Sequence, residues 1–160
     1  MIHRAKKFTS YIMKKNFFIR TFSIYFFLTS IGMTAQQNYF EKGLKLFENE
    51  KFEESKILFE KDLVFNPKNE QSYLYLAKIF HKNDNEEETE SNLNNVLLLN
   101  PQNDEAVYML TLLKIKQYDY KHAQKLVDQF NLICKSFCSK KEEINKKFKK
   151  LSPDNEKTND

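Results

Sequence analysis

The chain has 160 residues, enough for one domain, and 41% of them are hydrophobic, so it can bury a core. It contains only 2 glycines and 3 prolines, whereas sheet-rich folds need both residues at frequent turns, so a mostly helical fold is expected. Six of the 26 basic residues and none of the 22 acidic residues precede Gln36, which leaves 20 basic and 22 acidic residues from there onward. A nucleic-acid partner is therefore not expected, because it would require a basic stripe on the folded part.

The N-terminal segment has the pattern of a secretory signal peptide. Lys14 and Lys15 provide a positive start, residues 21–33 form an uncharged and largely apolar run, and Ala35 offers a small residue for cleavage. The apolar run is shorter than the ~20 residues that span a bilayer. We therefore expect residues 13–35 to be a cleaved leader and the protein to be exported, either periplasmic or secreted. The alternatives are an uncleaved inner-membrane anchor and a buried core helix.

The start and the end of this leader are less well defined. A leader that begins at Met13 is complete without residues 1–12, which we interpret as an upstream extension assigned in error. Met33 is larger than the residue that signal peptidases favour two positions before the cut, so cleavage after Gly32 is the alternative. No cysteine follows the cleavage point directly, so a lipoprotein anchor is not expected.

A repeated pattern follows the leader. The stretches NPKNEQSYLYLAKIF and NPQNDEAVYMLTLLK are similar, and they place Pro67 and Pro101 in the same register. The interval between these prolines lies within the 20–50 residues that are typical of stacked repeat architectures. In each block, apolar residues at a spacing of three to four form two runs around a polar break, which predicts two amphipathic helices joined by a turn. Registered on the prolines, the blocks are 36–69, 70–103 and 104–137.

These blocks resemble the tetratricopeptide repeat (TPR), a helix–turn–helix unit of about 34 residues. The resemblance covers residues 36–135 and implies an all-α fold of three tandem helix–turn–helix repeats in a right-handed superhelix. The positions that match its pattern are Tyr39, Gly43, Leu46, Phe52, Phe59 and Pro67 in the first block, Tyr73, Ala77, Phe80, Leu93, Val96 and Pro101 in the second, and Val107, Tyr120, Ala123, Val127 and Phe130 in the third.

Small residues and their replacements mark where the helices of a repeat should meet. Gly43 and Ala77 are expected at the close crossing of the two helices of a repeat. Asp62, Thr89 and Thr111 depart from the pattern, which has small residues at their positions. No proline follows the third block, so this block matches least well.

Residues 139–151 are predicted to form a C-terminal helix that caps the last repeat, because the end of an array needs a polar-backed neighbour. Ser139 and Glu142 predict a capping box at its start, and three apolar residues share one face. The alternative is a basic helix that binds a membrane surface or an acidic partner. Residues 152–160 are polar and are expected to be a disordered tail.

In tetratricopeptide arrays, the first helix of each repeat lines a concave groove that holds a peptide or a partner helix. The groove of related chaperone adaptors grips a C-terminal carboxylate, but Phe40, Leu44 and Tyr75 occupy the matching places here, so that activity is not expected. The corresponding groove residues in this sequence are Phe40, Leu44, Phe47, Gln71, Leu74, Lys78, His81, Lys82, Glu105, Tyr108, Leu112 and Ile115.

The resemblance implies a non-catalytic protein-interaction module, and the leader pattern predicts that this module belongs to the bacterial cell envelope. An apolar or amphipathic segment of a protein partner would lie in the groove, with Lys78 and Lys82 meeting a negative group. The groove could instead be filled by the C-terminal helix or by a second copy in a homodimer. A different alternative is a membrane-tethered structural or assembly factor, which would require that the leader stays uncleaved.

The remaining reactive side chains do not form a recognisable catalytic set. Cys134 and Cys138 are close enough on a helix to pair, but a disulfide would require the helix to break near Ser136, so a disulfide and two free thiols both remain open. Metal binding is disfavoured because no histidine lies near the cysteines. A phosphate loop needs several glycines, and only Gly43 follows the leader. No enzyme activity, cofactor or metal is therefore expected.

Overall fold

The computed structural model describes residues 39–151, and all regular secondary structure in this range is helical, as predicted. The predicted leader, the extension before it and the polar tail lie outside the described residues. The helices are α2 (Tyr39–Glu48), α3 (Phe52–Phe65), α4 (Glu70–Lys82), α5 (Glu86–Leu99), α6 (Asp104–Lys116), α7 (Tyr120–Ile133), the 3-10 turn η2 (Cys138–Lys140) and α8 (Lys141–Leu151).

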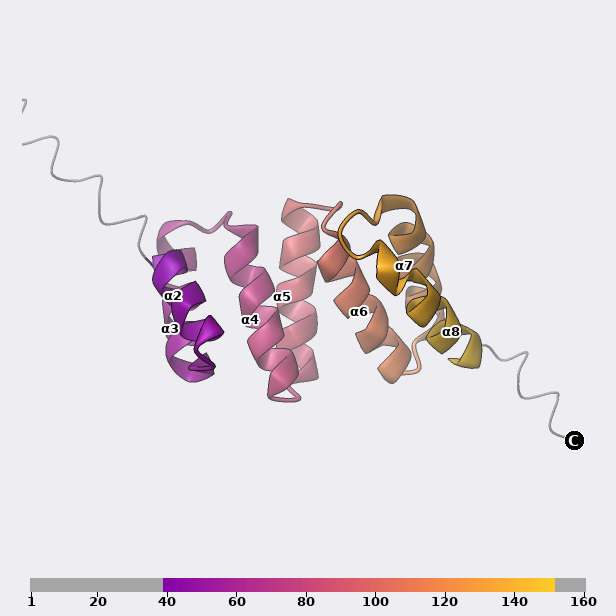
Figure 1. The fold of residues 1–160 in the computed structure, drawn as a ribbon, viewed down its shortest axis with the longest axis horizontal. Helices are drawn as coiled ribbons and strands as arrows, with labels where there is room; N and C mark the ends of the chain where they lie inside the picture. Colours follow the sequence, from indigo (N-terminus) through magenta and orange to yellow (C-terminus); the bar gives the residue numbers. More distant parts are fainter. Residues whose placement is uncertain (1–38, 152–160) are drawn as a thin grey trace, which may run out of the picture. The chain divides into compact units, whose positions relative to one another are not determined.

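The helices form three consecutive hairpins, α2–α3, α4–α5 and α6–α7, and each hairpin packs against the next. Figure 1 shows α2, α4, α6 and α8 in the nearer layer, with α3, α5 and α7 behind them. The three predicted blocks therefore correspond to three tandem helix–turn–helix repeats, and α8 packs on α6 and α7 at the end of the array.

The Asn-Pro segments are the connections between repeats. Asn66 and Asn100 follow the last residues of α3 and α5, and a proline comes directly after each of them. Asn69 and Asn103 then cap α4 and α6, because their side-chain oxygens accept backbone N–H groups of the first helical turn at 3.1 and 2.9 Å. The repeated Asn-Pro sequence thus specifies where one helix ends and the next begins.

The turns inside the repeats use an unusual backbone conformation. Glu50, Asp84 and Tyr118 are the residues with positive φ among those described, at 60°, 53° and 57°. They lie at equivalent positions of the three repeats, one in the turn of each hairpin. Left-handed backbone normally favours glycine, which relieves the contact between Cβ and the following carbonyl. The chain makes these turns without glycine, which explains how it can have so few.

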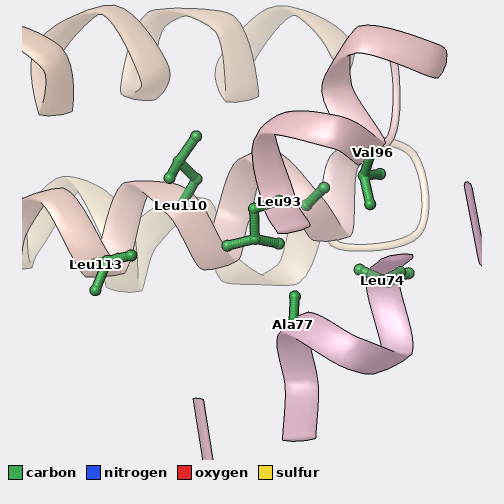
Figure 2. Close-up of a cluster of buried hydrophobic side chains, with 7 residues drawn as sticks. Leu74, Ala77, Leu93, Val96, Leu110 and Leu113 are labelled. Atoms are coloured by element: carbon green, nitrogen blue, oxygen red, sulfur yellow. The ribbon is translucent and has the colours of Figure 1, made fainter. Parts of the chain in front are cut away.

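Three apolar clusters join the successive units. The first holds repeats one and two together and centres on Phe59, Leu76 and Ile79. The second lies between repeats two and three, where side chains from α4, α5 and α6 converge, as Figure 2 shows. It consists of Leu74, Ala77, Leu93, Val96, Ala106, Leu110 and Leu113. The third joins repeat three to α8 and consists of Val107, Ala123, Val127, Phe130, Ile144 and Phe148.

The predicted close crossing in the first repeat is present. Gly43 is buried, and a Cβ atom placed on it would lie only 2.9 Å from Cε1 of Phe59. Ala77, at the equivalent position of repeat two, is fully buried. In repeat three this position is Thr111, whose hydroxyl donates to the carbonyl of Val107 at 2.6 Å, so that a polar side chain is accommodated within its own helix.

Asp62, which replaces a small residue of the repeat pattern, is stabilised in the core by hydrogen bonds. Asp62 is 3% exposed, and its carboxylate accepts hydrogen bonds from Asn69 and Ser72, each at 2.6 Å. Both donors lie at the start of α4, the next helix. Thr89 is satisfied locally, since its hydroxyl donates to the carbonyl of Asn85 at 2.7 Å. Every buried side-chain polar atom within residues 39–151 has a hydrogen-bond partner.

The C-terminal helix begins at Lys141 and follows the 3-10 turn Cys138–Lys140. Ser139 therefore lies inside that turn rather than at the N-cap, and the predicted capping box is wrong. The predicted cap itself is present, because Ile144 and Phe148 are buried against the third repeat. Packing of this apolar face determines where the helix lies, while the local capping pattern does not determine where it begins.

Candidate binding surface

Most of the predicted groove residues lie on the first helices of the repeats, in one layer. Their surroundings differ from one end of the array to the other. At the N-terminal end, the rings of Phe40 and Phe47 lie 6.0 and 5.0 Å from the ring of Tyr75, centroid to centroid. All three rings are half-buried, as is Leu44. This aromatic group spans α2 and α4 and leaves apolar surface available beside the joint between repeats one and two.

A charged pair lies next to this group. The Lys78 ammonium contacts Glu105 at 2.8 Å, and Nζ also lies 4.6 Å from the ring centroid of Tyr75. The two charged side chains are only 23% and 24% exposed, so the pair is partly shielded and connects α4 to α6. Burial raises the pKa of Tyr75, and the negative charges of Glu105 and Glu48 raise it further. The Tyr75 hydroxyl therefore stays protonated and can donate a hydrogen bond.

The last repeat presents little of its first helix, because α8 covers it. Tyr108, Leu112 and Ile115 pack against the cluster that contains Ile144 and Phe148. The predicted alternative, in which the C-terminal helix fills the groove, thus applies to the third repeat. It does not apply to the aromatic group on α2 and α4.

Charged side chains cover the edge of this contact. The Tyr108 hydroxyl donates to Glu143 at 3.3 Å, and Lys147 and Lys140 contact the same carboxylate at 2.9 and 3.1 Å. These two ammonium groups lower the pKa of Glu143 to about 2. Burial raises the pKa of Tyr108, and the charge of Glu143 adds to that effect. The network fixes the first two turns of α8 on α6.

A shallow pocket opens where α6 and α8 end. Its volume is about 430 Å³, and it is lined by Ile115, Lys116, Tyr118, Lys147, Lys150 and Leu151. Its lining therefore combines apolar side chains with three lysines. Lys116 already contacts Glu86 at 2.8 Å, and Lys147 contacts Glu143, so two of these charges are partly neutralised.

Four predicted groove residues have other positions or partners. Leu74 is 3% exposed and belongs to the core between repeats two and three, so its assignment to the groove is wrong. The reason is its place on α4, which is packed by neighbours on more sides than an end helix. His81 and Lys82 are exposed at the end of α4, and the Lys82 ammonium lies 4.4 Å from the ring centroid of Phe52. The Gln71 side chain donates to Glu70 at 3.4 Å.

Sequence analysis named Tyr75 only as a replacement at a carboxylate-binding place and left it out of the list of groove residues, although it provides the central ring of the aromatic group. A signal was available: Gln71, Tyr75, Lys78 and Lys82 follow a spacing of four, three and four, which is one helical face. The lysines of α8 that line the pocket were also missed. They become part of the surface only through the packing of α8 on α6, which no local pattern encodes.

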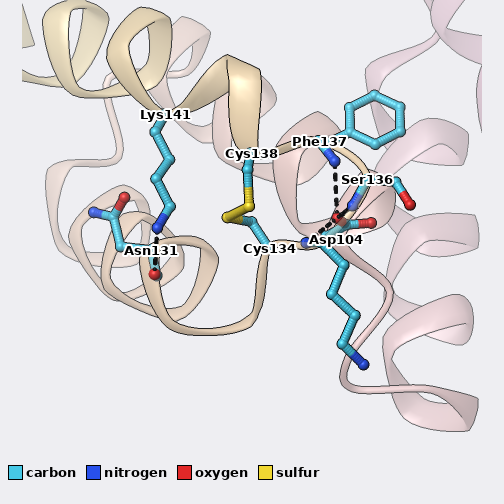
Figure 3. Close-up of a disulfide and its surroundings, with 8 residues drawn as sticks. Asp104, Asn131, Cys134, Ser136, Phe137, Cys138 and Lys141 are labelled. Atoms are coloured by element: carbon cyan, nitrogen blue, oxygen red, sulfur yellow. Dashed lines mark hydrogen bonds between the residues drawn. A yellow bond between two sulfur atoms is a disulfide. The ribbon is translucent and has the colours of Figure 1, made fainter.

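The structure joins Cys134 and Cys138 in a disulfide with a Cα–Cα distance of 5.1 Å. The helix α7 ends at Ile133, so the bridge lies in an irregular segment, as the predicted break requires. The backbone N–H groups of Lys135, Ser136 and Phe137 all donate to one carboxylate oxygen of Asp104, at 2.6, 2.6 and 2.9 Å (Figure 3).

Asp104 thereby ties the segment between the cysteines to the start of α6. Burial raises the pKa of Asp104, but these three backbone N–H groups and that of Glu105 outweigh this effect and hold the pKa below its usual value. The disulfide and this carboxylate together fix the path of the chain from α7 to α8. They therefore determine how α8 covers the third repeat.

Residues 39–151 contain no group of three or more His, Cys, Asp or Glu side chains that could hold a metal ion. The same range has no helix long and apolar enough to cross a membrane. His122 contacts Asp119 at 2.6 Å, and that aspartate also caps α7, so this pair has a structural role at a helix start.

Comparisons with known proteins relate the chain to solved structures only. The sequence matches no protein-family model and no curated protein. The first TPR of Spaghetti (RPAP3), solved with the HSP90 peptide SRMEEVD, is 19% identical with a TM-score of 0.64, covering 72% of this chain and 94% of that chain.

Two further structures agree with this similarity. The Yersinia enterocolitica type III secretion translocator chaperone SycD is 10% identical with a TM-score of 0.67, covering 81% of this chain and 91% of that chain. The Sgt2 TPR domain from Aspergillus fumigatus is 13% identical with a TM-score of 0.59, and the match covers 79% of this chain and 83% of that chain. At these identities the likeness concerns the fold. Together with the repeated hairpins, it shows that residues 39–151 have the fold of a tetratricopeptide repeat array.

Proposed function

We propose that this protein is a non-catalytic binding module that holds an apolar or amphipathic segment of another protein against α2 and α4. The observation that carries the proposal is the aromatic group of Phe40, Phe47 and Tyr75, which stays half-buried while α8 covers the equivalent surface of the third repeat. Aromatic side chains supply large contact areas and are enriched in protein interfaces.

The Lys78–Glu105 pair supplies the polar part of this surface. Because both charges are already paired, a bound segment gains little from a single charge of its own. A segment that donates to Glu105 and accepts from Lys78 fits better, which is the pattern of a carboxamide side chain. The similarity to a domain solved with a bound peptide supports a protein ligand.

We further propose that the protein acts outside the cytoplasm, in the bacterial cell envelope, since residues 13–35 have the sequence pattern of an export signal. Mass measurement of the protein recovered from producing cells tests this step. A chain that begins at Gln36 or Met33 supports export with cleavage. An intact N-terminus in the membrane fraction would instead favour the tethered assembly factor.

The binding experiment reverses the charged pair without breaking it. Lys78→Glu combined with Glu105→Lys keeps an ion pair between α4 and α6 but inverts the charge pattern beside Tyr75. The matched control is the same reversal at Lys51 and Glu54, an exposed pair 3.6 Å apart at the start of α3, in the other layer. Circular dichroism first verifies that both variants remain helical.

Each protein is then used to capture partners from envelope extract, and captured proteins are identified by mass spectrometry and purified for direct titration. The proposal predicts a partner that binds the unchanged protein and the control reversal, but binds the Lys78/Glu105 reversal at least roughly tenfold more weakly. Equal affinity for all three proteins would place the binding surface elsewhere and refute the proposal.

A further inference from the structure

An apolar ridge outside the proposed binding surface repeats with the period of the array. Val64, Leu98 and Leu132 are 76%, 80% and 86% exposed and occupy equivalent positions of the three repeats. Each is the next-to-last residue of its helix, α3, α5 or α7. The connections after these three helices lie along one edge of the array, the upper edge in Figure 1. We call these three residues the edge ridge.

The regular spacing sets this ridge apart from ordinary exposed apolar residues. Single exposed aliphatic side chains are common on protein surfaces and need no explanation. Here the same exposed position is aliphatic in all three repeats, although each repeat uses different residues elsewhere. Packing within the array does not require this, because the side chains point away from the core. An aligned set of exposed aliphatic side chains indicates a partner surface.

The charges that flank the ridge select the partner. One helical turn before the ridge residue, α3 carries Glu60 and Lys61, and α7 carries Asp128. Residues three and four positions apart share a helix face, so these charges border the ridge. At the same positions of α5, the central helix, the residues are Asn94 and Asn95, which are uncharged.

We propose that the edge ridge joins two copies of this chain in an antiparallel dimer with its two-fold axis at Leu98. In such an isologous dimer, each residue on the axis meets its own copy, so a charge there would face a like charge. The uncharged surroundings of Leu98 meet this requirement. Away from the axis, α3 of one copy faces α7 of the other, which brings Lys61 opposite the partner copy's aspartate at position 128. The neighbouring Glu60 is already paired within its own helix, with Lys56 at 3.7 Å.

The ridge is short, and this limits the strength of the dimer. Three aliphatic residues and the charged residues beside them would bury less than about 1,200 Å² in total, which is at the low end of the areas buried in specific interfaces. We therefore expect a weak, concentration-dependent dimer that forms in the micromolar range. The ridge lies on α3, α5 and α7, whereas the aromatic group lies on α2 and α4, so the two proposed surfaces share no residue.

The test is sedimentation velocity of the full-length chain over a wide concentration range. Leu98→Asp places two like charges across the axis and should raise the dimer dissociation constant roughly tenfold or more. The matched control is Tyr118→Asp, which changes an equally exposed apolar residue, 83% exposed, in the turn between α6 and α7. The control should dimerise like the unchanged chain.

A charge exchange tests the antiparallel arrangement. Lys61→Asp should weaken the dimer, and adding Asp128→Lys to it should restore the affinity. A chain that remains monomeric at all concentrations overturns the proposal, as does a dimer that Leu98→Asp leaves unchanged. Vesicles containing phosphatidylglycerol test whether the ridge binds lipid instead of a second copy. If the chain stays monomeric and binds these vesicles through Leu98, the ridge is a lipid-binding surface and the dimer proposal is overturned.

Discussion

Replacing Gly43 with alanine is expected to destabilise the protein, although alanine is the better helix former. The new Cβ atom would lie 2.9 Å from Cε1 and 3.0 Å from Cδ1 of Phe59. Carbon atoms do not approach this closely without a shift of one of them. Phe59 cannot move freely, because its ring is fully buried and lies 5.7 and 5.2 Å from the rings of Phe40 and Tyr75.

Two opposing terms determine the size of the effect. Alanine is favoured over glycine within a helix by about 1 kcal/mol. Overpacking a core by one carbon destabilises by about 1–3 kcal/mol when the neighbours are held in place. Because three aromatic groups hold each other here, we expect the second term to win, with a net loss of about 1 kcal/mol in the free energy of unfolding.

Urea unfolding followed by circular dichroism measures this change, with Lys45→Ala as the control on an exposed position of the same helix. A second background provides a sharper test. Phe59→Leu removes Cε1 and Cζ and replaces a rigid ring with a flexible side chain. In that background Gly43→Ala should become stabilising, by up to about 1 kcal/mol. If Gly43→Ala stabilises the unchanged protein, or if the two substitutions act additively, the close contact does not determine the residue at this position.

Three further effects follow from the turns and from the C-terminal connection. Tyr118→Gly should stabilise by about 0.5–1 kcal/mol by relieving positive φ, and Asp84→Gly should stabilise less because aspartate tolerates this conformation better; urea midpoints rank the two. Asp104→Asn keeps an acceptor but removes the charge, so the amides of residues 135–137 should exchange roughly fivefold faster. In the unchanged protein this protection is fully present above about pH 4 and should fall as the pH drops through the lowered pKa of the folded Asp104. Cys138→Ser should lower stability by roughly 2 kcal/mol at most under oxidising conditions, and melting curves of the reduced, unchanged protein should match those of the variant.

Each of these expectations has an outcome that contradicts it. If glycine stabilises neither turn position, relief of the positive φ does not contribute, and equal stabilisation at both would contradict the expected ranking. Unchanged amide exchange in the asparagine variant would show that the carboxylate charge contributes nothing to the connection. Incorporation of iodoacetamide into the native, unreduced protein would show that the two cysteines are free.

The sequence predicts the fold well because its signals are local and repeat. The Asn-Pro segments specify where α3 and α5 end, and the following polar residues cap the next helix. The apolar spacing specifies which faces are buried, so the core residues Ala77, Leu93 and Val96 agree with the matched pattern. All of these signals act within a few residues of the feature that they determine.

The features that sequence analysis missed depend on residues distant in the chain. Asp62 is acceptable in the core only because Ser72, on the next helix, donates to it. Asp104 receives backbone N–H groups from residues more than thirty positions later, and nothing at Asp104 itself indicates them. The turns at positive φ were missed for a different reason: their residues are not glycine, so the usual signal was absent.

Binding and stability are coupled at the aromatic group, and this affects how the proposed function can be tested. Phe47 and Tyr75 would contact a partner, but the same rings connect α2 to α4. Truncating either ring therefore weakens the joint between repeats one and two as well as the surface, and lost binding would have two explanations. The reversal of the Lys78–Glu105 pair reduces this ambiguity, because it keeps an ion pair between α4 and α6 and leaves all three rings in place, although it removes the contact of the Lys78 ammonium with the Tyr75 ring. A partner should, by the same coupling, stabilise the first hairpin against local unfolding, since it adds contacts to rings that already hold that hairpin in place.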